Sequence, residues 1–117
     1  MGPVTGRFTF HTAWENRPWW MVDLMTPQPV GQVRIFNRVD VLAVRANGLE
    51  LYVSNDGRHW ELAGQHQGAE PFGGVDGNPL EIDVNRTVRF VRLEVPWETI
   101  LHLDQVQVRG PVTGLGC

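Results

Sequence analysis

The most informative stretch of this sequence is His11-Thr12-Ala13-Trp14-Glu15-Asn16-Arg17-Pro18-Trp19-Trp20-Met21-Val22-Asp23-Leu24. Its second half, residues 20–24, is a short, mostly apolar run of the kind that forms a β-strand. Trp19 and Trp20 are adjacent, so in a strand their side chains point to opposite faces of the sheet. At least one of the two therefore belongs to the core.

Further stretches of the same kind follow along the chain. They alternate apolar and polar residues or run apolar over four to six positions, and they are residues 33–36, 49–53, 80–84, 90–95 and 103–108. Clusters of Pro, Gly, Asn and Asp separate them, including Pro27, Pro29 and Gly31. No stretch carries a sustained helical pattern. The sequence therefore predicts an all-β protein, an antiparallel sandwich or barrel of six to eight strands.

One turn is especially well marked. Asp56-Gly57 lies between Val53 and Trp60, and glycine accepts the positive φ that tight hairpins need. We expect a hairpin here, with Trp60 closing it as part of the core. Trp14 and Trp97 are expected in loops.

The overall composition indicates one domain, residues 1–117. Hydrophobic residues make up 42% and charged residues 20%, with a net charge of -3, so no basic surface for nucleic acid or anionic lipid is expected. All ten cations are arginines. No apolar run approaches the roughly 20 residues of a membrane-spanning helix, and the start of the chain does not look like a signal peptide. Cys117 is the only cysteine, so no internal disulfide forms.

The stretch at residues 11–24 resembles the discoidin family, also called coagulation factor five/eight type C. The family carries a His-Thr, a Pro-Trp-Trp and a Val-Asp-Leu at this spacing. The resemblance covers about residues 8–109 in order, and its other motifs are Asn37-Arg38-Val39-Asp40, Arg45-Ala46-Asn47-Gly48, Val53-Ser54-Asn55-Asp56-Gly57-Arg58-His59-Trp60, Arg89-Phe90-Val91-Arg92-Leu93 and a final Leu-x-x-Val-x-Val.

The resemblance implies a galactose-binding-like jelly roll of two packed antiparallel sheets, with ligand loops gathered at one end. It also implies a non-catalytic module that binds sugars, phospholipid head groups or proteins. Extracellular or cell-surface location is the habit of the family, whereas the absence of a signal peptide and of disulfides leaves a cytoplasmic location open.

The ligand positions are most similar to those of fucolectin-type fucose-binding lectins, which grip sugar hydroxyls with one histidine and two arginines. The matching residues are His11, Arg38 and Arg45. Fucolectins place two adjacent cysteines between the arginines, where this chain has Val41-Leu42, which would supply an apolar wall. Guanidinium groups donate in fixed directions and can fork across neighbouring hydroxyls.

Other residues complete the predicted site. Trp14 or Phe72 would cover the C–H face of a sugar. Asp40 lies between the two arginines and leaves a second interpretation open, in which an Arg–Asp pair only stiffens the loop. His11 is likewise either a ligand contact or a structural histidine.

Calcium is the usual structural cofactor of sugar-binding relatives, held by an early Asp-Gly-Asn loop and a glutamate in the last strand. Here the early loop is absent and Gln105 replaces the glutamate, so we expect no tight calcium site, because calcium prefers carboxylate oxygens. Asp76-Gly77-Asn78 is interpreted as a turn. His59 and His66 would be a metal pair only if they approached each other across a hairpin.

No motif of an enzyme is present: the sequence has no Gly-x-Ser-x-Gly, no His-Glu-x-x-His and no phosphate loop. The first hypothesis is therefore a carbohydrate-binding module that targets a larger protein to glycans. The second is a structural or protein-docking domain that contacts neighbouring domains, and phospholipid binding comes third because there is no lysine.

The start of the chain carries a separate expectation. Relatives begin with a further strand before the His-Thr segment, so the first strand looks truncated. We expect the residues around Val4 and Phe8-Thr9-Phe10 to pair with Val106-Gln107-Val108 and cover the edge that would otherwise be open. The pentapeptide Gly-Pro-Val-Thr-Gly, at residues 2–6 and 110–114, would then occur twice at one end of the sandwich.

Overall fold

The protein was examined as a computed structural model. It describes residues 4–11, 15–37, 46–67, 73 and 79–110, and of residues 4–11, 15, 102 and 104 only the backbone. The described residues form eight strands: β1 (Val4–His11), β2 (Glu15–Asn16), β3 (Trp19–Asn37), β4 (Glu50–Ser54), β5 (Glu61–Gln65), β6 (Leu80–Glu94), β7 (Glu98–Thr99) and β8 (His102–Arg109). The predicted all-β, antiparallel architecture is confirmed.

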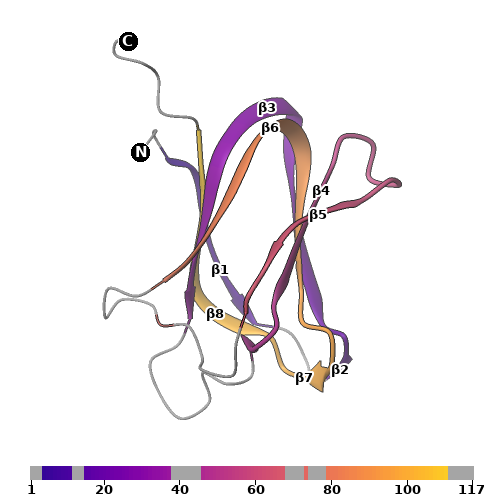
Figure 1. The fold of residues 1–117 in the computed structure, drawn as a ribbon, viewed down its shortest axis with the longest axis vertical. Helices are drawn as coiled ribbons and strands as arrows, with labels where there is room; N and C mark the ends of the chain where they lie inside the picture. Colours follow the sequence, from indigo (N-terminus) through magenta and orange to yellow (C-terminus); the bar gives the residue numbers. More distant parts are fainter. Residues whose placement is uncertain (1–3, 12–14, 38–45, 68–72, 74–78, 111–117) are drawn as a thin grey trace.

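Two long strands, β3 and β6, run through both layers of the sandwich. They pair antiparallel along their length and bend together, forming the arch at the top of Figure 1. Below the arch, one half of the pair continues into β8 and β1, and the other half continues into β4 and β5. The resulting order is β1-β8-β3-β6-β4-β5, a single sheet folded onto itself, and β2 and β7 form a separate two-stranded sheet.

This arch corrects the sequence prediction in two places. Residues 80–84 and 90–95 were expected as separate strands, but they lie in the two halves of β6 (Leu80–Glu94), except for Val95, which follows it. Residues 20–24 and 33–36 were expected as separate strands with a turn at Pro27 and Pro29, but they are the two halves of β3. The breakers bend the strand without ending it, because the pairing register shifts between Asp23 and Gln28 while β6 bends beside it. Met25 on β3 and Asn85 on β6 absorb the bend with positive φ values of 76° and 50°.

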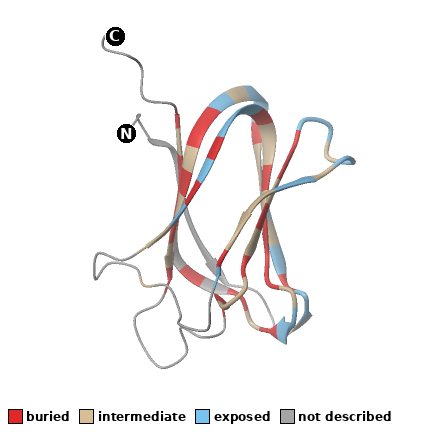
Figure 2. Ribbon diagram, viewed as in Figure 1, coloured by how far each residue is buried: buried red, intermediate tan, exposed pale blue. Residues whose placement is uncertain are grey.

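The core lies between the two layers. Buried residues alternate with exposed ones along the strands (Figure 2), as expected when only one face of each strand is covered. The fully buried side chains of largest volume include Ile35, Leu51, Leu93, Leu101 and Leu103.

The tryptophans divide as the spacing requires, with one exception. Trp20 packs against the core, whereas Trp19 is 49% exposed on the opposite face. Trp97 precedes β7 and is 40% exposed, as expected for a loop residue. The prediction for Trp60 is wrong: its ring lies edge-on to Phe90, 6.3 Å away between ring centres, outside the core. Val91 faces the core, so its neighbour Phe90 faces outward. Because Trp60 packs against Phe90, it closes the hairpin on the outer face of the sheet.

The N-terminal segment lies where the edge argument placed it. β1 pairs with β8 from Val4 opposite Arg109 to His11 opposite His102. Val4 of the first pentapeptide copy therefore pairs with Arg109, the residue directly before the second copy, which begins at Gly110. The remaining residues of the second copy lie outside the described part of the chain.

Candidate functional site

Most of the predicted ligand residues fall outside the described residues. Only the backbone of His11 is described, at the end of β1. The others that cannot be placed are Trp14, Arg38, Asp40, Val41, Leu42, Arg45 and Phe72. The interpretation that pairs an arginine with Asp40 is therefore untested, as is the wall at Val41-Leu42. Their described neighbours show where these segments begin and end.

His11 and the residue that precedes Arg38 lie on either side of one strand. His11 pairs with His102 and Asn37 pairs with Leu103, so the ends of β1 and β3 flank the start of β8. Two strand spacings separate them, which is about 10 Å between their Cα atoms. The chain thus leaves β1 and β3 at the same end of the sheet, on either side of β8.

The segment that carries Phe72 returns to this place. The backbone N–H of Asn37 donates to the carbonyl of Gly73 at 3.1 Å. Asn37 is only 1% exposed, so this bond is shielded from water. The residue before Arg38 and the residue after Phe72 are therefore fixed against each other.

The segment that carries Trp14 is fixed just beyond. Glu15 pairs with Thr99, and Asn16 with Glu98, in the small sheet of β2 and β7. Residues 98–103 thus pair in turn with Glu15, His11 and Asn37 and form a common base for the three segments (lower part of Figure 1).

Arg45 is followed by a tightly held turn. Ala46 is 1% exposed and its carbonyl accepts from the N–H of Leu49 at 3.1 Å. The N–H of Gly48, whose φ of 77° suits glycine, donates to Nδ1 of His66 at 3.1 Å. His66 is buried and so has a structural role here.

The structure contradicts the histidine metal pair. His59 lies in the turn before β5 and His66 directly after it, at opposite ends of that strand. Within the described ranges, no three His, Cys, Asp or Glu side chains lie close enough to hold a metal ion together. Gln105, which stands at the expected calcium position, accepts a hydrogen bond from Nε2 of Gln107 at 2.6 Å through its Oε1. That carbonyl oxygen is thus already engaged.

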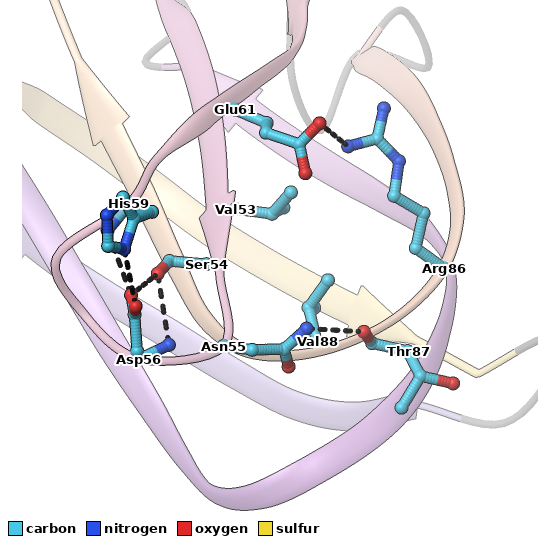
Figure 3. A pocket seen from close by; sticks show the side chains of 9 residues that line it. All are labelled: Val53, Ser54, Asn55, Asp56, His59, Glu61, Arg86, Thr87 and Val88. Atoms are coloured by element: carbon cyan, nitrogen blue, oxygen red, sulfur yellow. Dashed lines mark hydrogen bonds and ion pairs between the residues drawn. The ribbon is translucent and has the colours of Figure 1, made fainter.

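A polar pocket of about 280 Å³ lies near the arch, between β6 and the β4–β5 hairpin (Figure 3). Its most connected residue is Asp56. Oδ1 of Asp56 accepts from the N–H groups of Arg58 and His59, both at 2.8 Å, and Oδ2 lies 2.6 Å from Nδ1 of His59. These bonds hold the pKa of Asp56 well below its usual range and raise the pKa of His59.

The same pocket explains why Ser54, Asp56 and His59 are not a catalytic triad. Oγ of Ser54 accepts from the N–H groups of Asp56 and Gly57 and donates to Asp56, while His59 also bonds to Asp56. A triad needs the serine bonded to the histidine. The group instead stabilises the turn, with Gly57 at a φ of 74°.

The protein-family comparison identifies the fold family. A family model of the F5/F8 type C class, described as a NedA-like, galactose-binding domain, matches residues 6–93. The chain belongs to this family. The discoidin resemblance is thereby confirmed. No curated protein matches the chain.

Among solved structures, the domain is similar to two lectins. The lectin domain of lectinolysin, solved with the Lewis B antigen, is 27% identical with a TM-score of 0.67, and the match covers 87% of this chain and 71% of that one. A fucolectin from the serum of striped bass, Morone saxatilis, is 29% identical with a TM-score of 0.73. That match covers 87% of this chain and 35% of the fucolectin, so the domain spans about a third of that lectin.

A third structure supports the fold alone. The module CpGH89CBM32-5 from Clostridium perfringens, solved with GalNAc-beta-1,3-galactose, is 16% identical with a TM-score of 0.69, and the match covers 86% of this chain and 74% of that one.

Within the described part of the domain, no helix has the length and apolar character needed to cross a membrane.

Proposed function

We propose that this galactose-binding-like domain is a non-catalytic module that binds glycans through the loops at the end of the sheet opposite the arch. The ligand contacts are assigned to His11, Arg38 and Arg45, with Trp14, Phe72, Val41 and Leu42 against the apolar face of the sugar. The module targets a larger protein to its glycan, and neighbouring domains of that protein are its other partners.

The observation that carries the proposal is the common base of the loops. His11 and Asn37 pair with consecutive residues of β8, and Asn37 is bonded to Gly73. Three sequence segments that carry candidate contacts therefore start or end near one another. Two do so at the ends of β1 and β3, about 10 Å apart, and the third is hydrogen-bonded to the end of β3. Binding groups held by such a frame lose little freedom on association, which favours affinity.

The similarity to lectins supports the same ligand class. Two solved neighbours above 25% identity are a lectin domain in complex with the Lewis B antigen and a fucolectin. A histidine and two arginines offer the charge-assisted donors that vicinal hydroxyls require. A fucose-containing glycan is accordingly the proposed ligand.

The described residues also support a binding role over a catalytic one. The pair of carboxylates that a glycosidase uses should face each other across a cleft. Glu50 and Glu94, in the described region, are instead both bonded to Arg17. The Ser54, Asp56 and His59 group is used to hold a turn.

Isothermal titration with L-fucose and with the Lewis B tetrasaccharide tests the proposal. Wild-type protein should bind, and Arg38→Ala or Arg45→Ala should abolish binding while the melting temperature changes by only a few degrees. Arg86→Ala is the matched control, since this arginine is 42% exposed near the arch and lies 3.7 Å from Glu61. Its affinity should equal wild type.

Two results would count against the proposal. If Arg38→Ala or Arg45→Ala unfolds the domain, that arginine is structural. If wild-type protein binds neither sugar nor any spot of a glycan array, the loops serve protein docking instead.

A further inference from the structure

The outer face of β3, β6 and β4 is unusually apolar for a sheet face open to water. Trp19 is 49% exposed and Met21 38% exposed on β3, and Leu62 is 49% exposed on β5. Tyr52 and Arg92 lie between them in register, because Arg92 pairs with both Met21 and Tyr52. Polar side chains usually cover such a face. Here three exposed apolar side chains lie around Arg92 and Tyr52, and a group of exposed apolar side chains is a candidate site of interaction.

Two tryptophans on this face are held in place by a guanidinium. Cζ of Arg92 lies 4.5 Å from the ring centre of Trp19 and 5.7 Å from that of Trp60. Trp60 in turn packs against Phe90 at an interplanar angle of 62°. Stacking on a cation fixes the orientation of each ring, yet about half of Trp19 remains exposed. The surface is therefore ordered before any ligand arrives.

The charges next to the rings are balanced. Arg92 donates to Oε1 of Glu94 at 2.9 Å, and Arg17 donates to Oε2 of Glu94 at 2.6 Å and to Oε1 of Glu50 at 3.0 Å. Tyr52 donates its hydroxyl to Glu50 at 3.0 Å, and burial together with this bond raises the pKa of the phenol. Two guanidiniums thus face two carboxylates, so the cluster offers a charged ligand no net attraction.

A small cavity opens on this face. It measures about 130 Å³ and is lined by Tyr52, Trp60, Arg92 and Glu94. That is room for about four water molecules, which is enough for the edge of a sugar ring and too little to enclose a whole ligand. Arg92 lines this cavity, and its side chain is 27% exposed, so part of its guanidinium faces the solvent there. A ligand hydroxyl can accept a charge-assisted hydrogen bond from such a group.

From these observations we propose a second carbohydrate-binding surface on the outer face of β3, β6 and β4, selective for neutral oligosaccharides. The free side of Trp19 covers the C–H face of one sugar unit. The exposed part of the Arg92 guanidinium donates to a hydroxyl in the cavity, and the hydroxyl of Tyr52 accepts from another. Because the face is open, a ligand longer than one unit lies across the strands.

A printed array of neutral animal, plant and bacterial oligosaccharides separates this surface from the loop site. The double variant Arg38→Ala/Arg45→Ala, which disables the proposed loop site, should keep signal on a subset of the oligosaccharides. Excess L-fucose should not compete with that signal. Adding Trp19→Ala should lower it by about tenfold, since an aromatic platform contributes on this scale.

Met25→Ala is the control, and Tyr52→Phe is a second test of the surface. Met25→Ala in the double variant removes another exposed apolar side chain, 73% exposed at the arch, and should leave the signal unchanged. Tyr52→Phe keeps the ring but removes the hydroxyl, so it should weaken the signal without disturbing the packing. Thermal melting of each variant confirms that it is folded.

Three results would overturn the second surface. If Arg38→Ala/Arg45→Ala abolishes all signal, only the loop site binds. If the remaining signal survives both Trp19→Ala and Tyr52→Phe, it comes from elsewhere. If wild-type protein gives no signal on the array, neither site binds glycans, and the exposed tryptophans only cover the outer face of the sheet.

Discussion

The guanidinium of Arg89 donates two parallel hydrogen bonds to the carboxylate of Asp23, from Nε to Oδ1 at 2.8 Å and from Nη2 to Oδ2 at 2.9 Å. Asp23 belongs to the Val-Asp-Leu motif of β3, and Arg89 begins the Arg-Phe-Val-Arg motif of β6. Asp23 also accepts from the N–H of Met25, whose positive φ starts the bend. The pair thus ties the two long strands together where they enter the arch, and it explains why these motifs contain these charges.

Breaking this pair should destabilise the arch. Arg89→Lys keeps the charge but cannot form the parallel pair of bonds, so we expect a drop of a few degrees in melting temperature, and a larger drop for Arg89→Ala. Arg86→Ala, three residues away with a weaker ion pair, is the control. Equal melting temperatures for Arg89→Ala and Arg86→Ala would contradict this role.

The same pair predicts a pH dependence. The bonds from Arg89 and Met25 lower the pKa of Asp23 in the folded protein. A lowered pKa stabilises the fold above the ordinary aspartate pKa of about 3.9, and this contribution is lost as the pH falls through the folded value. Between about pH 5 and pH 2, the free energy of unfolding of the wild-type protein should therefore fall more than that of Asp23→Asn. Urea denaturation at each pH measures this free energy. If it fell equally with pH in the two proteins, Asp23 would have no such role.

The hairpin turn gives a pH effect of opposite sign. Asp56 raises the pKa of His59, so the ion pair stabilises the fold fully below the ordinary histidine pKa of about 6.5 and is lost as the pH rises through the folded value. His59→Asn should remove this decline, leaving the melting temperature flat over that range. The group is exposed, with the histidine side chain 90% accessible, so the effect should be small and reduced further by salt. A decline in melting temperature that persists in His59→Asn would assign it to another group.

Close packing between the layers gives a sharper test. A Cβ added at Gly64 of β5 would lie 2.5 Å from Cγ2 of Ile82 on β6. Gly64→Ala should cost about 1–3 kcal/mol, the usual effect of overpacking a core. Adding Ile82→Ala should make room, so the double variant should be more stable than the sum of the single variants predicts. Additive free energies of unfolding would mean that the two sites do not touch.

The sequence predicted the strand segments well because each one alternates inward and outward residues, as in Leu51, Tyr52 and Val53. It did not predict that residues 20–24 and 33–36 form one strand, because Pro27 and Pro29 end strands in most settings. Here the two prolines bend the strand without ending it, because β6 bends beside them. That pairing joins residues far apart in the sequence, so the local pattern does not reveal it. The position of Trp60 was missed for a similar reason, since the outer face is covered by Phe90 and Arg92 from a distant strand.

The candidate site shows the same limit. The spacing of His11, Arg38 and Arg45 predicted a shared site, and the pairing of His11 and Asn37 along β8 is consistent with it. The outer-face cluster gave no local signal, because Trp19, Tyr52, Trp60 and Arg92 come from four separate segments. Exposed tryptophans read from a linear sequence look the same as buried ones.

Calcium removal tests a prediction that the contacts leave open. Gln105 is a neutral amide at the position where the discoidin resemblance leads us to expect a glutamate, and its carbonyl oxygen accepts a hydrogen bond from Gln107 at 2.6 Å. A metal bound only by the native state raises stability in proportion to the logarithm of its concentration over Kd. We therefore expect the melting temperature to stay the same when a chelator is added. A fall of about ten degrees would reveal a tight site that these residues do not suggest.

The last prediction concerns the edge of the folded sheet. β1 pairs only with β8 among the described strands, from Val4 opposite Arg109 to His11 opposite His102. Deleting residues 1–7 removes the partners of Gln107, Val108 and Arg109, so their backbone groups become an open edge that invites another chain. Stability should fall by several kcal/mol, since each ladder hydrogen bond contributes about 1 kcal/mol, or the protein should dimerise. Deletion of residues 1–3, which removes no residue of β1, is the control. Urea denaturation and analytical ultracentrifugation of both deletions decide the matter: a monomer of unchanged stability after removal of residues 1–7 would show that the first half of β1 contributes nothing to the fold.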